Sequence, residues 1–126
     1  MAKRVVPKAQ NAPGGARLAV NPEEFGVHAE SAAALLRTMG GKSRLLVLCN
    51  LVEGERSVGE LQRIVGLSQS ALSQHLAVLR RSKLVETRRE MQTIYYRLAG
   101  GAASAVLETL HGIYCAPSAD GKSRGR

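Results

Sequence analysis

The feature that most constrains this chain is the stretch from Gly66 to Arg81. If successive residues are spaced roughly 100° apart around a helix, Leu76 and Leu79 fall within about 40° of Leu72 and form a narrow apolar spine. The opposite arc is polar and becomes cationic toward its end, with Gln69, Ser70, Ser73, Gln74, Arg80 and Arg81. A core helix with a polar outside fits this pattern. A helix that reads DNA fits it too, because Gln and Ser can bond base edges and Arg can bond phosphate.

The residues before this helix favour the DNA-reading interpretation. Ser57 and Glu60 have the spacing of a capping box, and the helix that they open continues to about Val65. Its buried stripe is expected to contain Val58, Leu61 and Ile64 or Val65. Gly66 can adopt a positive φ and end that helix, and the hydroxyl of Ser68 can cap the next one. Two short helices joined by a turn that contains Gly make a helix-turn-helix.

The residues after this helix predict a β-hairpin. Residues 84–89 and 93–98 are alternating or rich in β-branched and aromatic residues, and residues 90–92 can form the turn between them. The expected fold class is therefore mostly α with a β-hairpin wing, a winged helix-turn-helix, and the wing would lie along the DNA backbone or minor groove. The candidate DNA-binding residues are Ser68, Gln69, Ser70, Ser73, Gln74, His75, Arg80, Arg88, Arg89 and Gln92.

Three further helices complete the expected domain. One Ala-rich helix should span residues 23–39, and the next should span residues 43–53, followed by a loop at 54–56. The buried side of the second is expected to hold Leu45, Leu48, Cys49 and Val52. A last helix should end at Cys115, so the domain would span residues 23–115 with five helices and the hairpin before the fifth. The first and last helices would supply a dimer interface through Ala32, Leu36, Val106, Leu110 and Ile113.

The net charge of +8 is unevenly distributed. Residues 63–97 hold seven basic and two acidic residues, whereas the adjoining segments 21–62 and 98–115 are each net acidic. The positive charge of the domain thus lies on the expected helix-turn-helix and wing, as phosphate binding requires. The two tails are also basic, and we expect residues 1–22 to be a disordered arm and residues 116–126 a disordered tail.

No apolar run approaches the roughly 20 residues that a membrane-spanning helix needs. The first residues, Met1 to Val6, also lack the apolar core of a signal peptide. We therefore expect a cytoplasmic protein with no membrane partner.

The stretch Leu67–Leu76, with Leu79-Arg80 and Leu84-Val85 after it, resembles the DNA-binding core of the ArsR family of bacterial winged-helix repressors. Residues 39–48 resemble that family's preceding helix, and the resemblance covers roughly residues 25–115. It implies a homodimer that binds an inverted-repeat operator in double-stranded DNA and releases it when an inducer binds.

The two cysteines decide which inducer is expected. A protein of the cytoplasm rarely keeps a structural disulfide, so metal binding and redox sensing are the chemistries to weigh. Metal sensors of the ArsR family place ligands in the first helix of the helix-turn-helix or as pairs along the last helix. In this sequence the first helix of the helix-turn-helix has no Cys, and the last helix offers His111 and Glu108. Two thiols and one His make a poor zinc site, so we expect no bound metal and no cofactor.

Cys49 in the second helix and Cys115 at the end of the last resemble the paired cysteines of the persulfide- and redox-sensing branch of that family, the BigR- and SqrR-like repressors. The resemblance implies that a disulfide or a chain of sulfurs bridges them, that reactive sulfur species are the inducer, and that the regulated genes serve sulfide detoxification. Helix axes typically pack about 8–10 Å apart. We therefore expect a bridge with one or two extra sulfurs to close more easily than a disulfide. The alternative is that Cys49 is a small core residue and Cys115 an incidental thiol.

Three functions therefore remain for this sequence. The first is a transcriptional repressor switched by two thiols, the second a metal-responsive repressor of the same fold, and the third an architectural DNA-binding protein without an inducer. The sequence contains no constellation of nucleophile, base and acid, so we expect no enzyme.

Overall fold

The computed structural model describes residues 20–115, and the chain divides into two compact units, residues 1–33 and 34–126. The expected C-terminal tail lies outside the described residues, as does all but the end of the expected N-terminal arm. The first helix within the described residues begins at Pro22, one residue before the helix start expected from the sequence.

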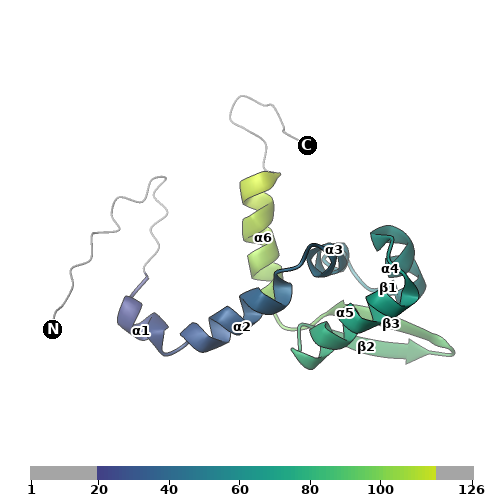
Figure 1. The fold of residues 1–126 in the computed structure, drawn as a ribbon, viewed down its shortest axis with the longest axis horizontal. Helices are drawn as coiled ribbons and strands as arrows, with labels where there is room; N and C mark the ends of the chain where they lie inside the picture. Colours follow the sequence, from purple (N-terminus) through teal and green to yellow (C-terminus); the bar gives the residue numbers. More distant parts are fainter. Residues whose placement is uncertain (1–19, 116–126) are drawn as a thin grey trace. The chain divides into compact units, whose positions relative to one another are not determined.

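The first helical segment is interrupted. Helix α1 (Pro22–Gly26) is capped by Asn21, whose side chain accepts hydrogen bonds from two first-turn backbone N–H groups at 2.9 and 3.2 Å. A turn follows, and α2 runs from Ala29 to Met39 (Figure 1). The prediction of one continuous helix over residues 23–39 was therefore wrong. At Val27 and the next residue, backbone N–H groups bond carbonyls three residues back instead of four. Helix α1 buries none of its residues, so no packing opposes this break.

The second unit is organised around α5 (Gln69–Arg81), which packs against α3 (Lys42–Asn50) and strand β2 (Val85–Glu90). Its three expected spine residues, Leu72, Leu76 and Leu79, are buried, which confirms that prediction. They form the centre of one core that also contains Met39, Val47, Leu48, Leu51, Leu61, Leu84, Val85, Tyr96 and Ala103.

The helix-turn-helix has the predicted caps. Helix α4 (Val58–Val65) begins with a complete capping box, in which the Ser57 hydroxyl accepts from the Glu60 N–H at 3.1 Å and the Glu60 carboxylate accepts from the Ser57 N–H at 2.8 Å. Gly66 ends it with φ +75°. Ser68 then caps α5 by accepting a hydrogen bond from the N–H of Ala71. These local bonds fix where α5 starts and therefore which side chains its exposed face presents.

The wing is an antiparallel hairpin of β2 and β3 (Thr93–Leu98), joined by the two residues Met91 and Gln92. A third strand, β1 (Arg56–Ser57), pairs with β3, so the strand order is β1-β3-β2. The sequence predicts a loop at residues 54–56, whereas Arg56 belongs to this strand. A strand of two residues is too short to show alternation in the sequence, and it exists because its backbone pairs with β3.

The buried face of α3 differs from the expected one. The core residues on and just after this helix are Val47, Leu48 and Leu51, whereas Cys49 and Val52 are exposed. The helix also ends at Asn50, three residues before the predicted end. Apolar residues occupy nearly every position from 45 to 52, so their spacing alone could not select the buried side.

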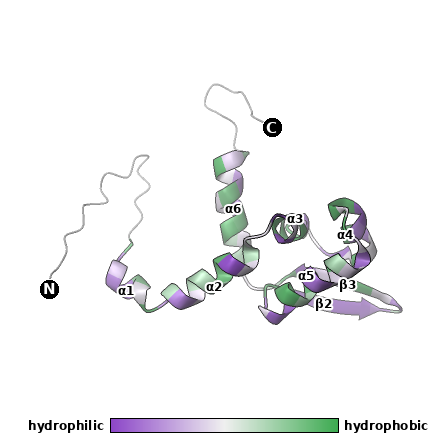
Figure 2. Cartoon of the chain, in the orientation of Figure 1, coloured by the Kyte–Doolittle hydropathy of each residue, from purple (hydrophilic) through white to green (hydrophobic). Residues whose placement is uncertain are grey.

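Helix α6 (Ala102–Tyr114) is joined to the core at its first turns, where Ala103 is buried and Val106 and Leu107 pack on the core. Most residues of α6 are hydrophobic, in contrast to those of the hydrophilic β2 (Figure 2). Near its end, Ile113 and Tyr114 are 64% and 72% exposed. Within residues 20–115 no helix has the length and hydropathy to cross a bilayer.

Candidate nucleic-acid interface

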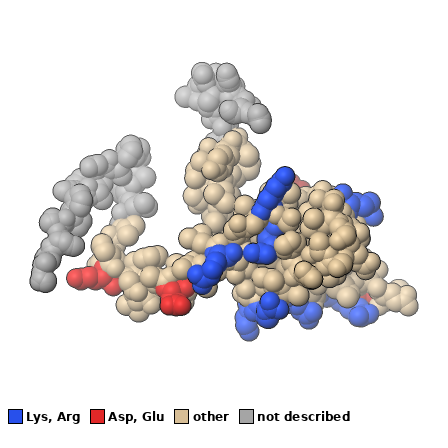
Figure 3. Space-filling model, viewed as in Figure 1, with Lys and Arg blue, Asp and Glu red and all other residues tan. Residues whose placement is uncertain are grey.

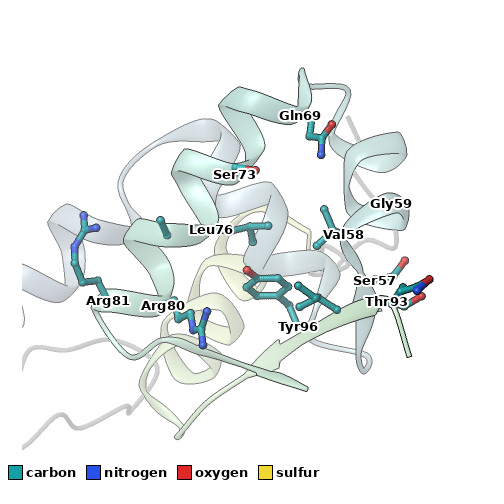
Figure 4. A pocket seen from close by; sticks show the side chains of 13 residues that line it. Ser57, Val58, Gly59, Gln69, Ser73, Leu76, Arg80, Arg81, Thr93 and Tyr96 are labelled. Atoms are coloured by element: carbon teal, nitrogen blue, oxygen red, sulfur yellow. The ribbon is translucent and has the colours of Figure 1, made fainter. Parts of the chain in front are cut away.

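A groove of about 870 Å³ lies between α5, the start of α4 and strand β3. Figure 4 shows Gln69, Ser73 and Arg80 on the α5 side and Thr93 and Tyr96 on the β3 side. The apolar side chains that line it are Val58, Leu76, Ala77, Ile94 and Tyr96. The groove therefore combines an apolar lining with amide, hydroxyl and guanidinium groups.

Four of the candidate residues come together in this groove: Gln69, Ser73, Arg80 and Gln92. Ser70 and Gln74 are exposed on the outer side of α5 and do not line the groove. The side chain of Ser68 is engaged as the cap of α5. The groove also contains residues that the sequence reasoning did not select: Arg81, Gly59 and Thr93.

His75 lies on a different side of α5. Its Nδ1 is 3.2 Å from Nη1 of Arg44 on α3, and Nε of Arg44 donates to the carbonyl of Thr38 at 2.5 Å. Because a guanidinium only donates, Nδ1 of His75 accepts this hydrogen bond and the ring proton of the neutral form is on Nε2. This contact fastens α5 to α3 and to the end of α2, and His75 is half-buried beside them.

The two adjacent arginines of the wing lie on opposite faces of the sheet. Arg89 is paired across the strands with Ile94 and lies on the same face of the sheet as Tyr96. Ile94 and Tyr96 both line the groove. Arg88 is paired with Tyr95 on the outer face. Within residues 20–115, Arg89 forms no ion pair, whereas Arg88 binds two carboxylates.

The carboxylates bound by Arg88 belong to Glu55 and Glu90. Hydrogen bonds from Arg88 hold the pKa of Glu55 below its ordinary value, and the two carboxylates raise the pKa of Arg88. A second pair on the outer face joins Arg97 to Glu86 at 3.4 Å. Basic charge on this face is therefore compensated.

Uncompensated basic charge lies instead near α5. Within residues 20–115, Arg80 and Arg81 form no ion pair. In Figure 3, Lys and Arg side chains lie along the lower edge of the second unit, where α5 and the wing lie, and others lie above them. This distribution favours a polyanion approaching the α5 side of the wing.

Both thiols are exposed and free. Cys49 is on the exposed side of α3, and Cys115 follows the last turn of α6. The alternative that Cys49 is a small core residue is therefore wrong. Among residues 20–115, the structure brings together no group of three or more His, Cys, Asp or Glu side chains that could hold a metal ion.

A helix-turn-helix with a hairpin wing, and a polar and cationic groove between its second helix and that wing, defines a winged-helix DNA-binding protein. Comparison with known proteins identifies the family. The model of bacterial regulatory proteins of the arsR family matches residues 41–87. Over 96 residues the chain is 48% identical to the transcriptional activator HlyU of Vibrio cholerae, an alignment that covers 76% of this chain and 89% of HlyU.

Two solved structures agree with this result. The transcriptional repressor BigR from Xylella fastidiosa superposes with a TM-score of 0.74 at 44% identity, covering 77% of this chain and 99% of that one. Reduced HlyU from Vibrio cholerae gives a TM-score of 0.70 at 48% identity, covering 75% of this chain and 99% of that one. The chain belongs to the ArsR family and is a DNA-binding transcriptional regulator.

Proposed function

We propose that this regulator is a homodimeric repressor that reads an inverted-repeat operator with α5 and the wing. We further propose that it leaves the operator when Cys49 and Cys115 are bridged by a disulfide or a short chain of sulfurs. Reactive sulfur species are then the inducer, and the regulated genes serve sulfide detoxification.

The groove carries the DNA-reading part of the proposal. Gln69 and Ser73 offer both donors and acceptors, which suits base edges in a major groove, and the apolar lining suits a thymine methyl group. Arg80 lines the same groove, and Arg89 lies across the strands from Ile94, which lines it too. Within residues 20–115 neither arginine forms an ion pair, which suits phosphate. Ser70 and Gln74 extend the same exposed face of α5.

The exposed apolar surface supports the homodimer. Leu36 on α2 is 58% exposed, and Ile113 and Tyr114 at the end of α6 are more exposed still. A second copy of the chain would remove these side chains from water, as the hydrophobic effect favours. A dimer with two recognition helices explains an operator with two half-sites about one DNA turn, 34–36 Å, apart.

Exposure of both thiols is the observation that supports the switch, because only an accessible thiol reacts with a sulfur donor or an oxidant. With a persulfide RSSH, each thiolate attacks the outer sulfur, gives a cysteine persulfide and releases RSH. The outer sulfur of the Cys115 persulfide then attacks the inner sulfur of the Cys49 persulfide and expels HS⁻. The product is a trisulfide, and no further oxidant is needed. A plain disulfide forms when the Cys115 thiolate attacks the inner sulfur of the Cys49 persulfide and expels HS⁻, or when an oxidant such as peroxide accepts two electrons from the two thiols.

The test measures binding of the reduced protein to a duplex that it selects from a randomised DNA library. Glutathione persulfide, hydrogen peroxide and zinc are then added separately. Release by persulfide with a Cys49–Cys115 link of more than two sulfurs in the mass spectrum is expected. Cys49→Ser and Cys115→Ser should each bind DNA normally and resist release. Release by zinc alone would indicate the metal-responsive alternative, and no release by any reagent would indicate an architectural protein.

A further inference from the structure

Arg88 forms a clamp across the wing. From β2 it reaches over the central strand β3, where its guanidinium carbon lies 4.6 Å from the centroid of the Tyr95 ring. Its Nε and Nη2 donate to the two carboxylate oxygens of Glu55 at 3.0 and 2.7 Å, and its Nη1 donates to Glu90 at 2.9 Å. All three guanidinium nitrogens thus have acceptors within the chain, in the two-pronged geometry that makes such pairs strong and directional.

This arrangement is a poor phosphate site. The side chain of Arg88 is compensated by two carboxylates, so the cluster carries excess negative charge. A phosphate would have to displace at least one of them and approach the other. The cluster also lies on the outer face of the wing, opposite to the face shared by Ile94 and Tyr96 of the groove.

The partner Glu55 belongs to the connection between α3 and β1. A turn within this connection is closed by the N–H of Gly54, which donates to the carbonyl of Leu51 at 3.2 Å. The end of the connection is fixed to α3, because Nε of Arg56 donates to the carbonyl of Asn50 at 3.1 Å. Strand β2 is at the edge of the sheet and pairs only with β3 among the described strands. Arg88 is therefore a side-chain link from this edge strand to the body of the domain.

We propose that Glu55 and Arg88 are positioning residues, which hold the wing at the angle to α5 that forms the DNA-reading groove. This inference rests on the proposed reading of DNA by α5 and the wing. According to this proposal, Glu55 strengthens the binding of DNA, although its negative charge by itself would weaken it.

The experiment compares Glu55→Gln with Glu86→Gln. Both variants remove one acid from the neighbourhood of the wing, but the pair of Glu86 and Arg97 lies within the hairpin and does not reach the body. Affinity is measured for the selected duplex and for a random duplex, each over a range of salt concentrations. Glu55→Gln should bind the selected duplex roughly two- to fivefold more weakly than Glu86→Gln, with an unchanged salt dependence.

Arg88→Lys provides the second variant. Lysine keeps the charge but cannot form the two-pronged bond. If Arg88 positions the wing, Arg88→Lys should lose as much affinity for the selected duplex as Glu55→Gln does. If Arg88 instead contacts phosphate, Arg88→Lys should keep most of its affinity. The proposal is overturned if Glu55→Gln binds the selected duplex as tightly as Glu86→Gln or more tightly. It is also overturned if Arg88→Gln, which removes the charge, has a flatter salt dependence than wild type, because that would indicate a lost phosphate contact. If the proposal that α5 and the wing read DNA is itself wrong, Gln69→Ala and Ser73→Ala will not change the affinity of the otherwise wild-type protein for the selected duplex.

Discussion

Arg88 and Arg89 are neighbours in the sequence and lie on opposite faces of the wing. The alternation of side chains along β2 gives them different surroundings, a pair of carboxylates for Arg88 and the groove side of the sheet for Arg89. The sequence suggested that both bind phosphate. The structure favours Arg89 for that role.

Substitution of Arg89 or Arg80 by Gln should weaken binding to all DNA sequences alike. Each lost phosphate contact should reduce the slope of log affinity against log salt by about 0.9. Arg97→Gln is the matched control, because it removes an arginine from the same wing but from the compensated outer face. A slope unchanged in both Arg80→Gln and Arg89→Gln would contradict this assignment.

Gln69 should read sequence rather than only add affinity, since its amide lies in the groove and can bond an adenine edge. Gln69→Ala should cost about 1–3 kcal/mol on the selected duplex and much less on random DNA. Gln74→Ala should act in the same way if the outer side of α5 also faces bases. Fluorescence anisotropy on the two duplexes measures the difference, and equal losses on both would exclude base reading.

The exposed end of α6 should hold the dimer together. Ile113→Glu places a charge on an apolar surface that a second copy is expected to cover, so it should shift the protein toward monomer in sedimentation equilibrium. Met91→Glu changes an apolar residue that is more exposed still but lies at the tip of the wing, and it should leave the dimer intact. A monomeric wild-type protein at micromolar concentration would refute the interface.

The two glycines at the ends of α4 should respond in opposite ways to alanine. Gly66 has φ +75°, where a Cβ costs about 1–2 kcal/mol, so Gly66→Ala should lower the melting temperature. Gly59 lies within the helix and a Cβ there meets nothing closer than 3.9 Å, so Gly59→Ala should stabilise by about 0.5–1 kcal/mol. Thermal unfolding of both variants checks the sign of each effect.

The capping box should contribute stability that depends on pH. The pKa of Glu60 is lowered from its ordinary value of 4.5, chiefly by the hydrogen bond from the backbone N–H of Ser57. The ionised carboxylate therefore stabilises the fold above pH 4.5, and this contribution is lost as the pH falls through the lowered value. The difference in melting temperature between wild type and Glu60→Ala should be largest at neutral pH and shrink toward pH 3. If this difference in melting temperature does not change with pH, the charge of the Glu60 carboxylate does not contribute to stability.

The parts of this fold that the sequence predicted well are those fixed by neighbouring residues. The caps at Ser57 and Ser68, the end at Gly66 and the spine of α5 each depend on residues at most a few positions apart. In α5 the three leucines occupy one narrow stripe, so the buried face could be predicted. These features determine the face of α5 that carries Gln69, Ser73 and Arg80.

The errors arose where the determining contacts are distant in sequence or the pattern is ambiguous. Helix α3 is apolar on several sides, and its burial was decided by what packs around it, which left Cys49 exposed. Arg88 binds Glu55, a residue 33 positions earlier that nothing in the local sequence connects to it. The hydrogen bond between Arg44 and His75 likewise joins two helices and removes His75 from the groove.

The compensated outer face of the wing also bears on how many DNA duplexes the wing can attract. A hairpin with basic side chains on both faces would adhere to a duplex on each side and would tie neighbouring segments of a crowded chromosome together. Here the outer face presents Glu55, Glu86 and Glu90 around its two arginines and repels a second duplex. We therefore expect each wing to contact one duplex, on the face that Arg89 shares with Ile94.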